Sequence, residues 1–169
     1  MPTGLKPTSS LIVISASVTQ SALGAFTAEQ VSLQLNPLDN EVFVIYGIDI
    51  DAQAPSLIAG QQTLNTASVS TTSRTSVGSI GDNNVLANAR IDTQDVGGSA
   101  VTNQYSSDSA PGTMLEYIGI LATNDFFLNI DAGANNLSPR VANCRIWGVR
   151  SRASSSIYAA LVQSELLSQ

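Results

Sequence analysis

The chain has 169 residues, of which 43% are hydrophobic and only 12% are charged. Globular domains usually contain about 25% charged residues, so this surface must consist largely of small uncharged side chains or be covered by other copies. We favour coverage by copies, because a weakly charged surface in contact with water lowers solubility. The net charge of −6 and the lack of a basic arm argue against direct binding to nucleic acid, which depends largely on neutralising phosphates.

The residues that carry most catalytic chemistry are scarce. The chain has no histidine, which excludes a Ser-His-Asp triad and histidine-bound metals. Its single cysteine, Cys144, excludes an intramolecular disulfide and is expected to be a buried small hydrophobic residue. Nucleotide-binding glycine motifs and paired cysteines are also absent. We therefore expect a protein that is not an enzyme and has no cofactor, with calcium as the one metal considered below.

The N-terminal segment predicts an extended arm followed by a strand. Residues 1–9 contain two prolines and a glycine and predict the arm. The apolar run Leu11–Val18, followed by Ala22-Leu23-Gly24, is similar to a secretory signal with a small-residue cleavage site. Its period-two alternation indicates a strand over 10–19 instead. No apolar run approaches the roughly 20 residues that span a membrane.

The longest alternating run, residues 41–51, predicts a central strand. At roughly 3.3 Å per residue it would span about 35 Å. We expect its even-numbered residues, from Val42 to Ile50, to form the core between two sheets. Phe43 and Ile45 fall on the opposite face, where we expect them to contact a terminal segment or another copy.

Further alternating segments predict strands at 31–35, 63–77, 85–91 and 140–150. The segment 92–112 predicts a surface loop or a short strand near 100–105. The clearest hairpin is predicted for 114–123 and 126–132, because Asn124-Asp125 between them are turn residues.

From Ser154 onward the apolar residues change to helical spacing, and no proline or glycine interrupts the segment. The predicted helix is apolar on two stripes. We expect it to cover one end of the sandwich or to dock on a neighbouring subunit, so the residues of the second stripe are interface candidates: Tyr158, Val162 and Leu166.

These elements predict an all-β fold, an antiparallel β-sandwich with an extended N-terminal arm and a C-terminal helix. About eight strands without βαβ alternation fit a single jelly roll, and an immunoglobulin-like sandwich fits the same count. The expected organisation is an arm at 1–9, a sandwich domain at 10–152, and a helix at 153–169 that packs on the sandwich or on a neighbouring subunit.

Acidic side chains offer the only candidate metal or catalytic groups. Asp49 and Asp51 lie two apart on one strand face, as a catalytic carboxylate pair or the metal ligands of a hydrolase could. Together with Asp131 and the asparagines that follow it, they are candidate calcium ligands. No spacing matches a calcium-binding motif, and solvated strand ends are the simpler interpretation.

Four of the seven basic residues fall between positions 140 and 152, at the last predicted strand. One interpretation is that this arginine edge meets an acidic edge of a neighbouring copy, which would set register and orientation. The alternatives are contact with packaged nucleic acid and a plain solvated strand. The interface candidates here are Arg145, Arg150 and Arg152.

The runs Val42–Ile50 and Arg145–Leu167, with Ser/Thr/Asn-rich loops between them, resemble small jelly-roll capsid proteins of tailless or marine viruses. The resemblance lies in architecture and composition, and it departs from many capsid proteins of RNA viruses in lacking a basic N-terminal arm. It implies a capsid or capsid-decoration protein located in the virion, whose partners are copies of itself and other virion proteins. The alternative, from another class, is a carbohydrate-binding or adhesion β-sandwich module.

Overall fold

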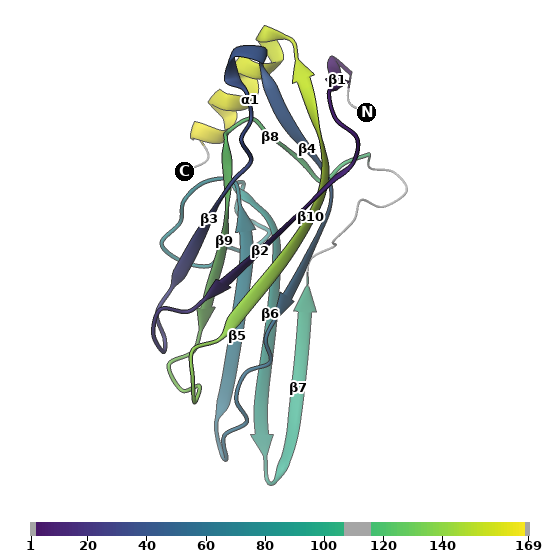
Figure 1. Ribbon diagram of the computed structural model, residues 1–169. Coiled ribbons are helices and arrows are strands. Elements are labelled where there is room, and N and C mark those ends of the chain that lie inside the picture. Colours follow the sequence, from purple (N-terminus) through teal and green to yellow (C-terminus); the bar gives the residue numbers. More distant parts are fainter. Residues whose placement is uncertain (1–2, 107–115, 168–169) are drawn as a thin grey trace.

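Two five-stranded antiparallel sheets pack face to face in the computed structural model, which describes residues 3–106 and 116–167 (Figure 1). Sheet I comprises β1 (Leu5–Pro7), β2 (Ile12–Thr19), β4 (Glu41–Ala52), β8 (Gly119–Leu121) and β10 (Val141–Ala153). Sheet II comprises β3 (Thr27–Ser32), β5 (Gln62–Ser70), β6 (Val85–Val96), β7 (Ser99–Ser106) and β9 (Asp125–Ala132). A 3-10 turn, η1 (Pro37–Asp39), precedes β4, and helix α1 (Ser155–Leu167) follows β10.

The strand order is that of a jelly roll. Sheet I runs β2–β10–β4–β8 and sheet II runs β3–β9–β5–β6. This order arises when one antiparallel ribbon, with its first strand paired to its last and its second to the next to last, is wound around a core. An immunoglobulin-like order would place the first two strands in one sheet, whereas β2 and β3 lie in different sheets. The predicted eight-stranded jelly roll is therefore confirmed, with β1 and β7 as additions.

Strand β4 contains a bulge near its middle. Trp147 of β10 lies opposite Gly47, and the next residue, Gly148, lies opposite Ile45, which leaves Tyr46 as the extra residue of β4. Side chains alternate along a strand, so one extra residue exchanges the two faces. Before the bulge the odd-numbered residues of β4 face the core, and after it the even-numbered residues do.

The bulge reverses the predicted roles of the first half of β4. Phe43 and Ile45, predicted to lie on the outer face as interface candidates, are 1% and 0% exposed and belong to the core between the sheets. Val42 and Val44, predicted to face that core, instead form part of a second apolar cluster on the outer face of sheet I. The prediction for these four residues was wrong because it assumed unbroken alternation.

The hairpin predicted for 114–123 and 126–132 does not form. β8 pairs with β4 in sheet I, whereas β9 pairs with β3 and β5 in sheet II. Asn124-Asp125 therefore carry the chain from one sheet to the other. The side chain of Asn124 accepts a hydrogen bond from the backbone N–H of Leu35 at 2.6 Å, which ties this crossing to the segment between β3 and β4.

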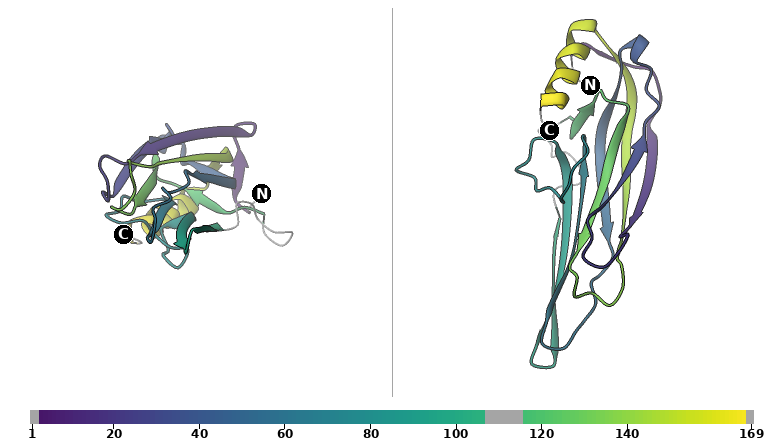
Figure 2. Two further views of the ribbon diagram at one scale, coloured as in Figure 1. Left: turned by 90° about the horizontal axis from the view of Figure 1, so that it is seen from below. Right: turned by 90° about the vertical axis from the view of Figure 1, so that its left-hand side faces the viewer.

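The segment 92–112 contains more strand than predicted. β6 continues to Val96, and a two-residue turn leads into β7. The turn residues Gly97 and Gly98 have φ values of +62° and +89°, which glycine adopts without strain. Figures 1 and 2 show this hairpin projecting beyond the end of sheet I. Parts of four predictions lie outside the described residues: 1–2, 107–112, 114–115 and 168–169.

The outer faces of the two sheets have different covers. Helix α1 lies over the outer face of sheet I, where Ile157, Tyr158, Leu161 and Val162 pack on the second apolar cluster (Figure 2). On the outer face of sheet II, the part around Ser68 and Ser70 is covered by the loop 71–84, which replaces the last part of the strand predicted for 63–77.

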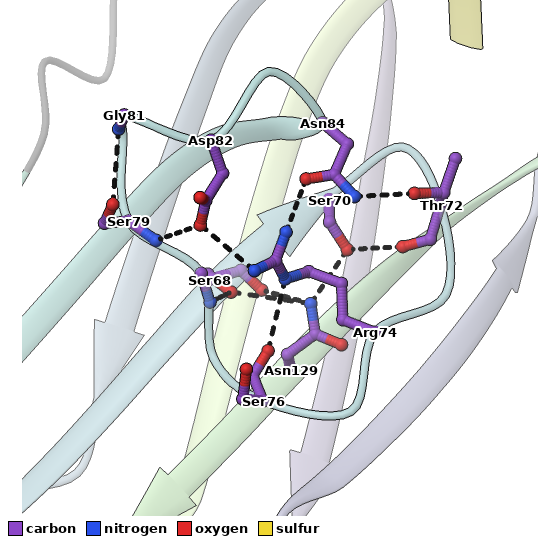
Figure 3. A network of polar contacts seen from close by, with 11 residues as sticks. Ser68, Ser70, Thr72, Arg74, Ser76, Ser79, Gly81, Asp82, Asn84 and Asn129 are labelled. Carbon is purple, nitrogen blue, oxygen red and sulfur yellow. Dashed lines mark hydrogen bonds and ion pairs between the residues drawn. The ribbon is translucent and has the colours of Figure 1, made fainter. Parts of the chain in front are cut away.

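The loop 71–84 is held by a buried polar network (Figure 3). The amide of Asn129 on β9 donates to the hydroxyls of Ser70 at 2.9 Å and Ser68 at 3.4 Å, and all three side chains are fully buried. Arg74 donates to three other residues of the loop: Ser76, Asp82 and Asn84. This arrangement gives the amide N–H groups of Asn129 acceptors, although its side-chain oxygen has no hydrogen-bond partner among the described residues, and it ties the loop to sheet II.

Candidate assembly surfaces

Strand β7 is the most open element of the described chain. It pairs with β6 along one edge, no described strand pairs with its other edge, and all eight of its side chains are exposed. Its sequence, Ser-Ala-Val-Thr-Asn-Gln-Tyr-Ser, contains no charge and no proline. An exposed strand edge of this kind is a template for pairing with another chain.

Three of the other four edge strands in the described sheets, β1, β3 and β8, carry features that oppose pairing. β1 and β8 are only three residues long, and β1 ends in Pro7. β3 exposes Glu29 at its centre. β2 is uncharged but packs against β3 and β9, and its inward side chains contact the core. Short edges, prolines and charges are the common protections of sheet edges, and β7 has none of them.

The second half of β4 contributes to a polar area on the outer face of sheet I. Asp49 lies opposite Arg145 of β10, and Asp51 lies opposite Asn143. Serines of β2 complete these rows, and an open hollow of about 730 Å³ lies over them. Neither aspartate has an ion-pair or hydrogen-bond partner among the described residues, and both are exposed. The hollow therefore offers two carboxylates to any polar ligand.

Two arginines of β10, Arg150 and Arg152, form hydrogen bonds and ion pairs with other residues of the same chain. Arg150 donates to the carbonyl oxygens of Leu33 at 2.9 Å and Gln34 at 3.3 Å, with the Glu41 carboxylate 3.9 Å away. Arg152 forms a 2.8 Å ion pair with Asp39. The acidic edge expected on a neighbouring copy thus lies on the same molecule, because η1 and the start of β4 adjoin the end of β10.

Arg145 differs from these two arginines. It is exposed, and its guanidinium lies 6.0 Å from the centre of the Trp147 ring, within cation–π range. No carboxylate within 4.0 Å pairs with it in the described chain. Among the three predicted interface arginines, Arg145 alone keeps its charge available to a partner.

The predicted second stripe of the terminal helix is divided in the structure. Tyr158 and Val162 are half-buried against sheet I of the same molecule, and Leu166 is 57% exposed. Leu166 therefore remains an interface candidate, whereas the other two already have an intramolecular partner.

The one buried side chain of α1 is acidic. Glu165 accepts hydrogen bonds from the backbone N–H groups of Ala122 at 2.8 Å and Thr123 at 2.9 Å, just after β8. Burial raises the pKa of the Glu165 carboxyl, and the nearby charge of Asp125 adds to the increase in pKa. Through these two hydrogen bonds, the Glu165 carboxyl group holds the C-terminal end of α1 against the segment that follows β8. The sequence offered no signal for it, because a glutamate near a helix end is usually solvated.

The three calcium candidates do not meet in one molecule. Asp49 and Asp51 lie on the outer face of sheet I, whereas Asp131 lies on the outer face of sheet II. Burial raises the pKa of Asp131, which disfavours its charged form. Within the described ranges no three or more His, Cys, Asp or Glu residues gather closely enough to hold a metal. The predicted set of ligands is therefore separated by the sandwich itself.

Apolar side chains are exposed on three loops at one end of the sandwich. The loops after β2, β4 and β9 expose Leu23, Leu57 and Leu137. Two of these loops are joined, since the backbone N–H of Leu137 donates to the Ser56 hydroxyl at 3.0 Å. Exposed apolar groups that gather at one end of a molecule are a feature of contact surfaces.

No family model matches the chain, and no curated protein matches it in sequence. Among solved structures, the fold is similar to apo chimpanzee polyomavirus VP1, with 6% identity over 88% of this chain and 98% of that chain, at a TM-score of 0.44. It is also similar to a structure of Desmodium yellow mottle tymovirus, with 16% identity over 91% of this chain and 85% of that chain, at a TM-score of 0.30.

None of the helices in the described ranges has the length and apolar character needed to cross a membrane.

Proposed function

We propose that this chain is a structural subunit that assembles with copies of itself into the shell of a virion, as a capsid or capsid-decoration protein. The observation that carries the proposal is the open, uncharged edge of β7 on a rigid jelly roll. Monomeric proteins protect such edges, so an unprotected edge on an otherwise well-packed sandwich favours a protein whose edge is covered by a partner.

Two further features support assembly. Charged residues make up only 12% of the chain, which suits a surface that is largely covered in the assembled state. The exposed leucines of the end loops provide apolar contacts at a second place on the molecule. A shell requires at least two different contact areas on each subunit, because a single two-fold contact gives only a closed dimer.

The proposed partners are copies of this chain and other virion proteins, with the genome held elsewhere. Two of the arginines at β10 are engaged with Asp39 and Glu41, and the net charge is −6. A surface of this sign attracts phosphates weakly. We therefore expect assembly of the purified chain without nucleic acid.

The test is electron microscopy and analytical ultracentrifugation of the purified chain over a range of protein concentration and salt. Regular particles or a reversible series of oligomers is the expected result. A protein that stays monomeric at every concentration, alone and with its co-purified partners, contradicts the proposal.

The polar hollow on sheet I supports the second candidate, a carbohydrate-binding module. Asp49, Asp51, Asn143 and Arg145 present both hydrogen-bond donors and acceptors on a rigid sheet, and Trp147 lies beside them. Sugars are bound by such combinations of polar groups and an aromatic ring. Binding on a glycan array that is lost in Asp49→Asn and Asn143→Ala favours this candidate, and an array without signal contradicts it.

A further inference from the structure

Strand β7 has an environment unlike that of the other strands. Its outward side chains include Val101 and Tyr105, which are 46% and 60% exposed. Its inward side chains are also exposed, because sheet I ends at β4 and β8 and does not extend over β7. About half of its backbone N–H and C=O groups point away from β6, toward the open edge. Among the described residues, the open edge of this strand has no partner, and its side chains are exposed on both faces.

A second copy of β7 is the occupant that these features fit best. Two identical strands related by a two-fold axis always pair antiparallel, and such self-complementary contacts are the commonest between identical chains. β7 has no charge that would meet its own copy. The other end of sheet II is different, since self-pairing of β3 about its centre would bring two Glu29 carboxylates together.

The faces of the sheet restrict the register. A two-fold axis perpendicular to the sheet keeps outward residues on the outward side, so directly opposed residues must both be odd-numbered or both even-numbered. An axis at Asn103 places Val101 of each copy opposite Tyr105 of the other. An axis at Thr102 places Val101 opposite Asn103 and Tyr105 opposite Ser99. Pairs of an aromatic and a β-branched residue stabilise antiparallel strands, which favours the axis at Asn103.

We propose that β7 pairs antiparallel with β7 of a second copy about a two-fold axis at Asn103, which joins the two five-stranded sheets II into one continuous sheet. This proposal rests on the proposed self-assembly, and it identifies β7 as the first contact through which two copies associate. Growth of the sheet stops there, because both ends of the joined sheet are then β3 strands that expose Glu29. The dimer is thus a closed unit that other surfaces link into a larger assembly.

A cysteine at the axis tests the contact directly. In Asn103→Cys, the two thiols lie opposite each other across the axis, where opposed β-carbons are about 4.5–5.5 Å apart. Mild oxidation is expected to give a covalent dimer. The native Cys144 does not interfere, because it is buried and its burial raises the pKa of the thiol to about 11. The matched control is Ala28→Cys, an exposed position on the edge strand β3.

A lysine provides an independent test that involves no oxidation. Val101→Lys removes the pair with Tyr105 and places a charge on the strand edge. We expect the mass measured by ultracentrifugation to fall from dimer to monomer, with at least a tenfold weaker association. Ala28→Lys makes the same change of charge on β3 and should leave the association as in the wild type. Circular dichroism and thermal unfolding establish that each variant is folded.

The outcomes separate this contact from the proposed function. If the wild type forms particles but Asn103→Cys forms no more covalent dimer than Ala28→Cys, the β7 contact is overturned and the shell function stands. If Asn103→Cys forms the dimer but the wild type never forms particles, the contact stands and the shell function is overturned. If Val101→Lys associates as strongly as the wild type, the proposed register is wrong.

Discussion

The two halves of β4 differ in what covers their outer face: the first half is buried under a helix, and the second half is exposed to solvent. Before the bulge, Val42 and Val44 point outward and lie fully buried under helix α1. After the bulge, Asp49 and Asp51 point outward on the same face and are exposed to solvent. The inner face is apolar from Phe43 to Ile50, so over these residues the difference concerns only the outer face.

This difference explains why the helix covers only one end of sheet I. Apolar side chains on the outer face need a cover, and charged ones do not. The bulge at Tyr46 is the point where the requirement changes. The helix is therefore part of the fold of this subunit, and the uncovered half of the face is available for ligands or partners.

Removal of residues 154–169 should have the largest effect, because it uncovers the first half of β4. We expect the free energy of unfolding to fall by about 4 kcal/mol, from the loss of several apolar side chains packed on the sheet. Urea denaturation measures the loss, and binding of a hydrophobic dye reports the uncovered patch. Leu167→Ser, at an exposed position of the helix, is the control and should change stability little. An unchanged unfolding midpoint in the truncated protein would show that the helix is not a cover.

Gly148→Ala tests the bulge itself. A β-carbon at this position would lie 2.5 Å from both the Phe43 ring and the carbonyl oxygen of Val44. Because backbone as well as side chain must move, we expect a loss of about 3 kcal/mol in the free energy of unfolding. The matched control is Gly81→Ala, where the nearest atom is 3.5 Å away. Equal stability of the two variants would contradict the tight packing of β4 on β10.

Glu165→Ala tests the attachment of the helix. It leaves the backbone N–H groups of Ala122 and Thr123 without their acceptor, and Ala122 is buried. We expect a loss of about 2 kcal/mol in the free energy of unfolding. Glu29→Ala, on an exposed strand, is the matched control and should have little effect on stability. A loss no larger than that of the control would show that these hydrogen bonds do not hold the helix.

The same carboxyl group should make stability depend on pH. Burial raises the pKa of Glu165 above its usual value of 4.5, so the folded protein keeps the proton at pH values where the unfolded chain has lost it. The contribution of this group is therefore greatest below pH 4.5 and decreases as the pH rises through its folded pKa. Glu165→Gln, which does not titrate, should remove this part of the pH dependence. Unfolding curves that change with pH equally in the variant and the wild type would contradict the assignment.

Asp49→Asn should have the smallest effect, because this side chain has no cover and no ion-pair partner among the described residues. We expect a change within about 0.5 kcal/mol in the free energy of unfolding. Val44→Asn, before the bulge, makes a change of polarity on the same face and should cost far more. Similar losses in the two variants would remove the distinction between the halves of β4.

The sequence predicted the class of fold correctly but misplaced several side chains. The jelly roll followed from long alternating segments and the absence of βαβ alternation. The bulge left no clear signal, since β4 is apolar on both faces around it; Gly47 within the strand was the only hint. The hairpin prediction failed because Asn-Asp favours a turn but does not determine where the next strand goes. That strand can pair with the previous one, or it can enter the other sheet, as β9 does.

For the assembly surfaces, the sequence identified candidate residues but did not show which side chains would surround them in the fold. Arg150 and Arg152 looked like a free basic edge, and the fold brought Glu41 and Asp39 to them from more than a hundred positions away. β7 was predicted as a loop or a short strand, because polar residues without charge alternate weakly in hydrophobicity. Its open edge is visible only once the neighbouring strands are in place.

Local chemistry in the sequence therefore determined most of the strands, among them β2, β4, β9 and β10, and the helix at Ser155–Leu167. It did not determine the bounds of β3, the loop that follows β5, or β7. The elements that it determined depend on alternation and on turn residues, which act within a few positions of one another. The tertiary structure alone decided which side chains of β4 face the core between the sheets, which charges are neutralised, and which strand edge of the described sheets is left open. Those outcomes depend on contacts between segments distant in the chain, and only the winding of the ribbon into two sheets brings them together.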